Sequence, residues 1–235
     1  MSAYETNTRL YLNIPIDELD QLDATQQLLD RLTKSLDVAC VNLLFANKAT
    51  GKPPSGNENL QSLVKDLQQK NIAVLANLTD HFYLEDRKSF EKALENSVNL
   101  MCDGIHMNAE IVLFERAREV LHKDAIIGCD CGTSKHQAMQ LGELGADYVA
   151  FRSSDTLSET PDGPDQLVEL ISWWQELFEV PCVAADIVDQ SQIEALMEIP
   201  ADFIAIGSKA FETLDNNEAL LSWLMKKCPL PEKAS

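Results

Sequence analysis

The sequence predicts an α/β protein, a single (β/α)₈ TIM barrel that forms one domain over residues 1–235. Eight short apolar runs, rich in Val, Ile and small residues, alternate with longer amphipathic stretches from one end of the chain to the other. The runs carry little polar/apolar alternation, which is typical of parallel strands covered on both faces. The chain has 235 residues, close to the roughly 250 that eight strand–helix units need.

The predicted strands are the apolar runs themselves. They are RLYLNIP (9–15), VACVNLLFA (38–46), IAVLANL (72–78), CDGIHMN (102–108), AIIGCDC (125–131), DYVAFRS (147–153), PCVAAD (181–186) and DFIAIGS (202–208). No Gly-x-Gly-x-x-Gly follows any of them, so the main signal of a dinucleotide-binding open sheet is absent. A doubly wound open sheet remains the alternative, because the first strand and the helix in RKSFEKALEN (87–96) have the weakest patterns.

Amphipathic stretches fill the gaps between the predicted strands. Several carry apolar residues at the i, i+3, i+4, i+7 spacing, which is the stripe of a helix with one buried face. The clearest stripe consists of Leu60, Leu63, Val64 and Leu67. Gly145 follows the fifth helix, at the usual place of a left-handed cap.

The charge of the chain excludes some classes of partner. With 19 basic and 38 acidic residues, the formal net charge is -19, so nucleic acid and anionic membranes would be repelled. No apolar run reaches the roughly 18 to 20 residues that span a bilayer. The stretch MSAYETNTRLYLNIP (1–15) lacks the basic flank and apolar core of a signal peptide. We therefore expect a cytoplasmic protein.

The chain has six cysteines, five of them in or beside the apolar runs, where Cys acts as a small hydrophobe. Without a signal peptide, reduced thiols are expected. Cys129 and Cys131 form a ligand-like pair, but no His or second Cys pair accompanies them. Alternation along the strand turns both thiols away from Asp130. We predict that they pack toward helices and bind no metal.

The stretch PCVAADIVDQ (181–190) shows where polar residues stand in the runs. Its small apolar strand finishes on Asp186, a carboxylate that does not suit the middle of a core. In (β/α)₈ barrels the chemistry lies at the carboxyl ends of the strands, because the eight strand-to-helix loops converge there. Asp186 is therefore expected at a polar mouth with the residues that end the other strands: Asn42, Asn77, His106, Asp130, Arg152 and Ser208.

Three of these residues are the candidate catalytic groups: His106, Asp130 and Arg152. His106 is a candidate acid or base, with a hydrogen-bonded structural histidine as the alternative. Arg152 ends the strand between those of Asp130 and Asp186, so a paired network is expected. Either this network only closes one side of the barrel, or Arg152 grips an anionic substrate, or the acids bind Mg²⁺ or a substrate amine.

The candidate substrate-binding residues are Asn42, Asn77, Asp186, Ser208 and Lys209. The last two follow the eighth strand, where phosphate sites in these barrels are often built. We therefore expect a small phosphorylated ligand as the partner, and no nucleic acid or membrane. A homodimer is left open.

The runs DGIHMN, AIIGCDC, GADYVAF, PCVAAD and FIAIGS resemble the thiamine phosphate synthase family, which includes the related thiazole tautomerases. The resemblance is strongest from about Ala73 to Phe211. It implies a (β/α)₈ barrel that joins hydroxymethylpyrimidine diphosphate to thiazole phosphate with Mg²⁺ and releases diphosphate. It also implies a transferase of thiamine biosynthesis.

Several site positions depart from the pattern of that family. Asn77 matches the family's asparagine after the third strand, but the adjacent Mg²⁺-binding aspartate is Leu78, and the second metal-binding aspartate falls on Ile111. Leu44 stands in the second-strand motif that holds pyrimidine and diphosphate, as do Asn42 and Ala46. The Gly-Gly after the seventh strand is Ala185-Asp186. The Mg²⁺ implied by the resemblance would therefore lack its usual ligands, and we predict no metal-ligating residue.

Two hypotheses follow from these departures. The chain is either a thiamine phosphate synthase-like transferase with a strongly altered active site, or a catalytically degenerate paralogue that binds a small molecule or a protein partner. The Mg²⁺ ligands discriminate between them, because the departure of diphosphate needs a cation.

Overall fold

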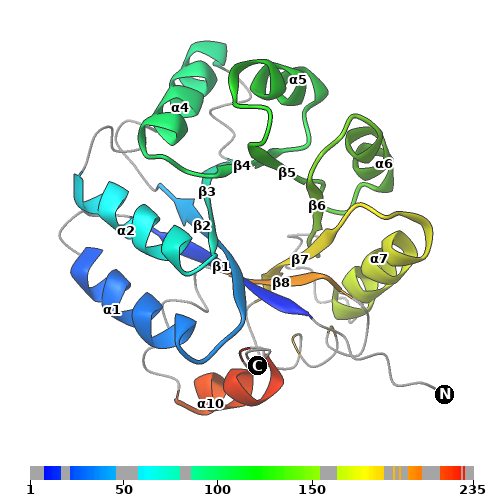
Figure 1. Cartoon of the computed structure of the whole chain (residues 1–235). Helices are drawn as coiled ribbons and strands as arrows, with labels where there is room; N and C mark the ends of the chain where they lie inside the picture. Colours follow the sequence, from blue (N-terminus) through cyan, green and yellow to red (C-terminus); the bar gives the residue numbers. More distant parts are fainter. Residues whose placement is uncertain are drawn as a thin grey trace.

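The computed structural model describes residues 8–16, 22–45, 58–79, 86–153, 163–187, 201–207 and 218–228, and the single positions 193, 196 and 230. These residues form a closed barrel of eight parallel strands in the order β1 to β8 (Figure 1). The predicted fold is confirmed. The open-sheet alternative is wrong, because β1 pairs with β8 from Arg9↔Phe203 to Leu12↔Ile206.

Strands and helices alternate along the described residues, and in Figure 1 the helices surround the ring of strands. The strands are β1 (Arg9–Pro15), β2 (Val38–Leu44), β3 (Ala73–Leu78), β4 (Gly104–Asn108), β5 (Ile126–Asp130), β6 (Tyr148–Phe151), β7 (Cys182–Ile187) and β8 (Phe203–Ile206). The helices are α1 (Leu22–Thr33), α2 (Glu58–Gln69), α4 (Arg87–Asn99), α5 (Ile111–Val120), α6 (Lys135–Glu143), α7 (Gly163–Leu177) and α10 (Glu218–Lys227). None of the described helices is long and apolar enough to cross a membrane.

The strands divide the buried side chains into two layers, because alternate residues of a strand point to opposite faces. The larger layer lies between strands and helices and contains Cys129 and Cys131. Asp130, between them in sequence, lines a cavity inside the barrel. The predicted orientation of the two thiols is therefore confirmed. Burial raises the pKa of the Cys129 thiol to about 12.

Both ends of α6 are capped, and the cap at its C-terminal end was predicted from the sequence. The side chain of Ser134 accepts a hydrogen bond from the backbone N–H of Gln137 at the N-terminus of the helix. At the other end Gly145 has φ +90°, the left-handed conformation predicted for a cap.

An aspartate stands immediately before each even-numbered strand. Asp103 Oδ2 accepts a hydrogen bond from the backbone N–H of Val74, at a distance of 2.7 Å. The equivalent side chains of Asp147 and Asp202 accept from the N–H groups of Ile127 (2.7 Å) and Cys182 (2.9 Å). Each carboxylate thus holds the beginning of the preceding odd-numbered strand. The fourth, Asp37, instead accepts from the guanidinium of Arg9 at 2.9 Å.

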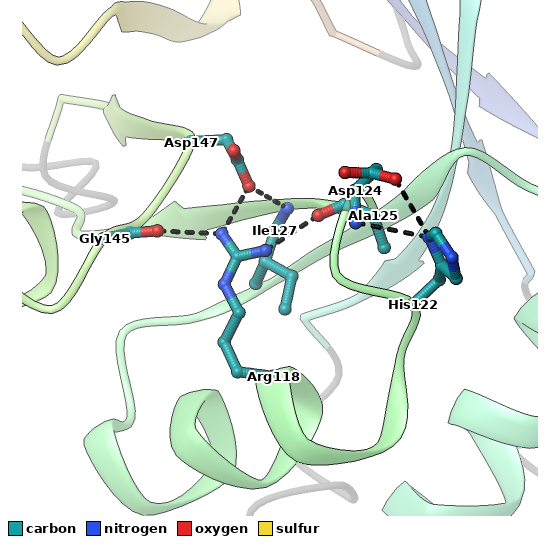
Figure 2. Close-up of polar contacts among 7 residues, drawn as sticks. All are labelled: Arg118, His122, Asp124, Ala125, Ile127, Gly145 and Asp147. Carbon is teal, nitrogen blue, oxygen red and sulfur yellow. Dashed lines mark hydrogen bonds and ion pairs between the residues drawn. The ribbon is translucent and has the colours of Figure 1, made fainter.

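Figure 2 shows how Asp147, one aspartate of this set, is tied to a helix. Arg118 of α5 donates to the carboxylate of Asp147 and to the carbonyl oxygens of Ala125 and Gly145, both at 2.8 Å. One guanidinium therefore joins α5 to the turns that precede β5 and β6. It satisfies backbone acceptors that would otherwise depend on water.

We expect Asp103→Ala to lower the free energy of unfolding by about 1–3 kcal/mol, because the N–H of Val74 loses a charged acceptor at the edge of the core. Urea denaturation measures this change. Glu143→Ala, at an exposed position of α6, removes the same charge and should change stability by less than about 0.5 kcal/mol. Equal effects of the two substitutions would show that charge, and not the hydrogen bond, is responsible.

Candidate functional site

A cavity of about 210 Å³ opens inside the barrel where the strands end, and we call it the mouth cavity. Its floor includes Tyr11, Ala150 and Val183, and Leu44 and Ala185 also line it. The other polar side chains that line it are Asn13, Asn77, Thr79, His106, Asn108, Asp130 and Arg152. Of the described residues expected at this mouth, Asn77, His106, Asp130 and Arg152 converge on the cavity, and Asn42 does not.

The predicted site residues are distributed unevenly around this cavity. Asn77, His106, Asp130 and Arg152 line it together. Asn42 is 1% exposed and does not line it; its Nδ2 donates to Asn13 Oδ1 at 2.9 Å. Ser208 and Lys209 lie outside the described residues, as does the side chain of Asp186, whose backbone belongs to β7.

Arg152 and Asp130 form an ion pair at the mouth, with Nε 3.3 Å from Oδ2. The Asp130 side chain is only 11% exposed, and its Oδ1 accepts from the backbone N–H of Gly132 at 2.9 Å. Arg152 N donates in turn to Gly132 O at 3.1 Å. Within the described residues, the strongest cation of the mouth is therefore held beside a carboxylate.

His106 is 8% exposed, and its Nδ1 lies 2.8 Å from the hydroxyl of Tyr148. Burial lowers the pKa of the imidazole from 6.5, since the charged form is poorly solvated. The negative charge of Asp130 opposes this shift and the positive charge of Arg152 adds to it. The burial of His106 therefore favours its neutral form.

Side-chain amides supply most of the remaining polar lining. Asn77 Oδ1 accepts from the hydroxyl and the N–H of Thr79, at 2.8 and 3.1 Å. Asn108 Nδ2 donates to Thr79 O at 2.9 Å. Asn42 Oδ1, behind the lining, is buried without a hydrogen-bond partner among the described residues. The described lining of the mouth is therefore rich in neutral donors and acceptors and poor in net charge.

The sequence reasoning missed the lining residues Tyr11, Asn13, Thr79 and Asn108. Strand periodicity carried a usable signal for three of them. Tyr11 and Asn13 are two residues apart on β1, and Asn108 is two residues beyond His106 on β4, so each pair shares a face.

The described residues do not fit Mg²⁺, which prefers six oxygen ligands in octahedral geometry with one or two carboxylates. Asp130 is the only carboxylate among the described residues that line the cavity, and it is engaged by Arg152 and Gly132. No group of three or more His, Cys, Asp or Glu side chains in the described part of the chain could hold a metal ion.

Comparison with known proteins places the chain among related sequences. Residues 20–210 match a family model described as thiamine monophosphate synthase. The chain is 34% identical over 170 residues to a thiamine-phosphate synthase of Rhodospirillum centenum, covering 72% of this chain and 74% of the relative. It is 31% identical over 214 residues to a thiamine-phosphate synthase of Hyphomonas neptunium, covering 90% of each.

Solved structures show the same fold at low identity. A tryptophan synthase structure from Mycobacterium tuberculosis superimposes with a TM-score of 0.68 at 12% identity, covering 97% of this chain and 96% of that one. A tryptophan synthase alpha-subunit from Pyrococcus furiosus gives 0.65 at 12% identity, covering 93% and 95%. At such identity the likeness concerns the barrel alone.

The buried neutral His106 makes stability depend on pH. Because its pKa in the folded protein lies below the unfolded value of 6.5, the unfolded state binds the proton first as pH falls. Between pH 7.5 and 5.5 the wild type should lose up to about 1.4 kcal/mol through this group. Urea unfolding of His106→Gln should show a shallower pH slope. A pH slope in His106→Gln equal to that of the wild type would contradict this role of His106.

Breaking the ion pair of the mouth should also cost stability. Arg152→Ala leaves the 11% exposed carboxylate of Asp130 without its cation, so we expect a loss of about 1–3 kcal/mol by urea denaturation. Arg116→Ala removes an ion pair with the exposed Glu91 on the outer helices and should cost less. A larger loss in Arg116→Ala would contradict the importance of burial at Asp130.

Proposed function

Because this chain belongs to the thiamine monophosphate synthase family, a family of thiamine biosynthesis, we propose that its mouth cavity binds a small single-ring precursor of thiamine and that the synthase reaction is weak or absent. The observation that carries the proposal is the pairing of Arg152 with Asp130 in a cavity whose other described lining residues are neutral.

The transfer reaction of the family requires diphosphate to leave, and its charge must be met by cations aimed at the departing group. In the described part of the mouth the guanidinium of Arg152 is already 3.3 Å from a carboxylate. A diphosphate entering there would have to displace Asp130 from Arg152 or lie beside a negative charge. This supports a loss of the diphosphate step.

The positions that the resemblance assigns to Mg²⁺ support the same proposal. Leu78 is 3% exposed and belongs to the core layer between strands and helices, and Ile111 packs against that layer. Both side chains are apolar and serve packing. Losing one group that stabilises transition-state charge commonly lowers the rate by about 10² to 10³, so the loss of two should leave little turnover.

The size and chemistry of the cavity support a neutral ring as the part of the ligand that lies inside it. Its volume of about 210 Å³ is below the roughly 300–1,000 Å³ typical of pockets for drug-sized ligands. Asn77 uses its Oδ1 for Thr79, which leaves the Nδ2 donor for a ligand. Amides and an imidazole at a floor of aromatic and small apolar side chains suit a heteroaromatic ring with acceptor atoms.

Ser208 and Lys209 remain the proposed contacts of a phosphate on that ligand. They follow β8, where the loops of such barrels often bind phosphate. In this proposal the ring occupies the mouth cavity, and a single phosphate reaches the end of β8.

The proposal is tested by thiamine phosphate formation from hydroxymethylpyrimidine diphosphate and thiazole phosphate with Mg²⁺. We expect turnover far below the ~1 per second of ordinary slow enzymes. The Rhodospirillum centenum thiamine-phosphate synthase, assayed in parallel, is the positive control. Turnover near ~1 per second would refute the loss of the diphosphate step.

Calorimetric titration with hydroxymethylpyrimidine, which carries no phosphate, tests the binding half of the proposal. Binding to the wild type is expected, and Asn77→Leu should weaken it by about 2- to 10-fold through the loss of one hydrogen bond. Glu143→Ala on α6 should leave it unchanged. No measurable binding to the wild type would contradict a ring-binding mouth.

A further inference from the structure

Two tyrosines cross the barrel interior beneath His106. The Tyr148 hydroxyl lies 2.8 Å from His106 Nδ1 and 2.9 Å from the Tyr11 hydroxyl. His106 and Tyr148 are stacked, with an interplanar angle of 6° and centroids 5.7 Å apart. All three side chains are buried, with exposed fractions of 8% or less. The histidine is therefore attached to an internal chain of hydrogen bonds, not only to the polar mouth.

Gly128 leaves the space that the hydrogen-bonded side chains occupy. In the sheet, Gly128 of β5 lies between His106 of β4 and Tyr148 of β6, as the register neighbour of both. A Cβ at Gly128 would stand 1.8 Å from Cζ of Tyr148. The phenol ring thus reaches His106 across a strand because that strand has no side chain at this level.

The number of available protons limits how the hydrogen bonds among Tyr11, Tyr148 and His106 can be directed. Burial raises the pKa of both tyrosines well above 10, so each phenol keeps its single proton. The Tyr148 hydroxyl donates its one hydrogen bond either to His106 Nδ1 or to the Tyr11 oxygen. In the first case Tyr11 donates to Tyr148; in the second His106 Nδ1 carries a proton and Tyr11 donates to the thiol of Cys40, its other neighbour.

The first arrangement uses the better partners. Phenol is a stronger acid than imidazole N–H, and an imidazole nitrogen is a stronger acceptor than a phenol oxygen. In the second arrangement the Tyr11 hydroxyl also donates its hydrogen bond to sulfur, which is a weak acceptor. In a low-dielectric interior these differences count more than in water.

We propose that Tyr148, supported by Tyr11, is a positioning residue that holds His106 in the tautomer with its proton on Nε2. The mouth cavity then presents a hydrogen-bond donor at His106 Nε2. This nitrogen makes no hydrogen bond to another described residue and is not among the buried unpartnered atoms, and His106 lines the cavity.

The tautomer selects the chemistry of the ligand. A donor at Nε2 pairs with an acceptor, such as a ring nitrogen, a carbonyl oxygen or a phosphate oxygen, and disfavours a ligand N–H at that point. This consequence rests on the proposed function in one respect, that the mouth takes a ligand. The tautomer itself does not depend on it.

The test is the ¹⁵N NMR spectrum of the imidazole nitrogens in histidine-labelled, ligand-free protein at pH 8. The chain has four histidines, and His106→Gln identifies the signals of His106. In the wild type, Nε2 is expected to show the shift of a protonated nitrogen, and Nδ1 that of an unprotonated nitrogen that accepts a hydrogen bond. A proton on Nδ1 would overturn the proposal.

Variants separate the Tyr148 contact from general effects on the core. Tyr148→Phe removes only the hydroxyl, and the Nδ1 signal should move to that of a nitrogen without a hydrogen bond. Tyr11→Phe also removes a buried phenol but leaves Tyr148 able to donate, so Nδ1 should keep its wild-type character. Equal changes in both variants, or no change in Tyr148→Phe, would overturn the role of Tyr148.

Gly128→Ala gives a second route to the same contact, because the added methyl group must displace the Tyr148 ring. In folded protein its Nδ1 signal should follow that of Tyr148→Phe, and a wild-type Nδ1 signal would overturn the proposal. Since no ligand is present, these spectra stand whether or not hydroxymethylpyrimidine binds. Failure of the proposed function and failure of the tautomer proposal are thus distinguishable.

Discussion

The pairing of β1 with β8 is the constraint on which the rest of the structure depends. A closed barrel has no free edge, so each backbone N–H and C=O of its strands must find a partner on a neighbour or at an end of the barrel. At the N-terminal ends, aspartates before β4, β6 and β8 supply acceptors for N–H groups of the first or second residue of the preceding strands. These contacts fix where each pair of strands begins, and register then fixes which residues finish at the mouth.

The two ends of the barrel use acidic residues differently. At the N-terminal end, Asp103, Asp147 and Asp202 hold backbone groups in place. At the C-terminal end, Asp130 is paired with Arg152 and cancels most of the charge of the described mouth. The described lining of the mouth is therefore close to neutral, although the chain as a whole carries a formal net charge of -19. A neutral lining suits a heteroaromatic ring better than a diphosphate.

The two positions at which the resemblance to the family implies Mg²⁺ ligands carry packing side chains in the described structure. Leu78 and Ile111 pack in or against the layer between strands and helices. The space that they fill contributes to stability, since burying a large aliphatic side chain is worth about 1.5–3 kcal/mol. Family membership is shared with thiamine-phosphate synthases, but the described mouth combines His106 with amides and with a cation already paired to Asp130.

Periodicity in the sequence determined the number and order of the strands and the helical stripes. It predicted that His106, Asp130 and Arg152 lie at one end of the barrel, because the carboxyl ends of parallel strands in a barrel lie together. It also determined the direction of Cys129 and Cys131, which follows from alternation within one strand. Such features depend on the spacing of residues along the chain, so they can be predicted from local sequence patterns.

Only the tertiary structure decided which side chains meet across the barrel. Tyr148 reaches His106 because register places Gly128 between them, and Tyr11 joins them from β1, which is far away in sequence. Likewise, Asn42 bonds to Asn13 and not to the cavity because β1 and β2 pair with these two residues side by side. Contacts of this kind depend on register and closure, which follow from the free energy of the whole barrel and leave no periodic trace in the sequence.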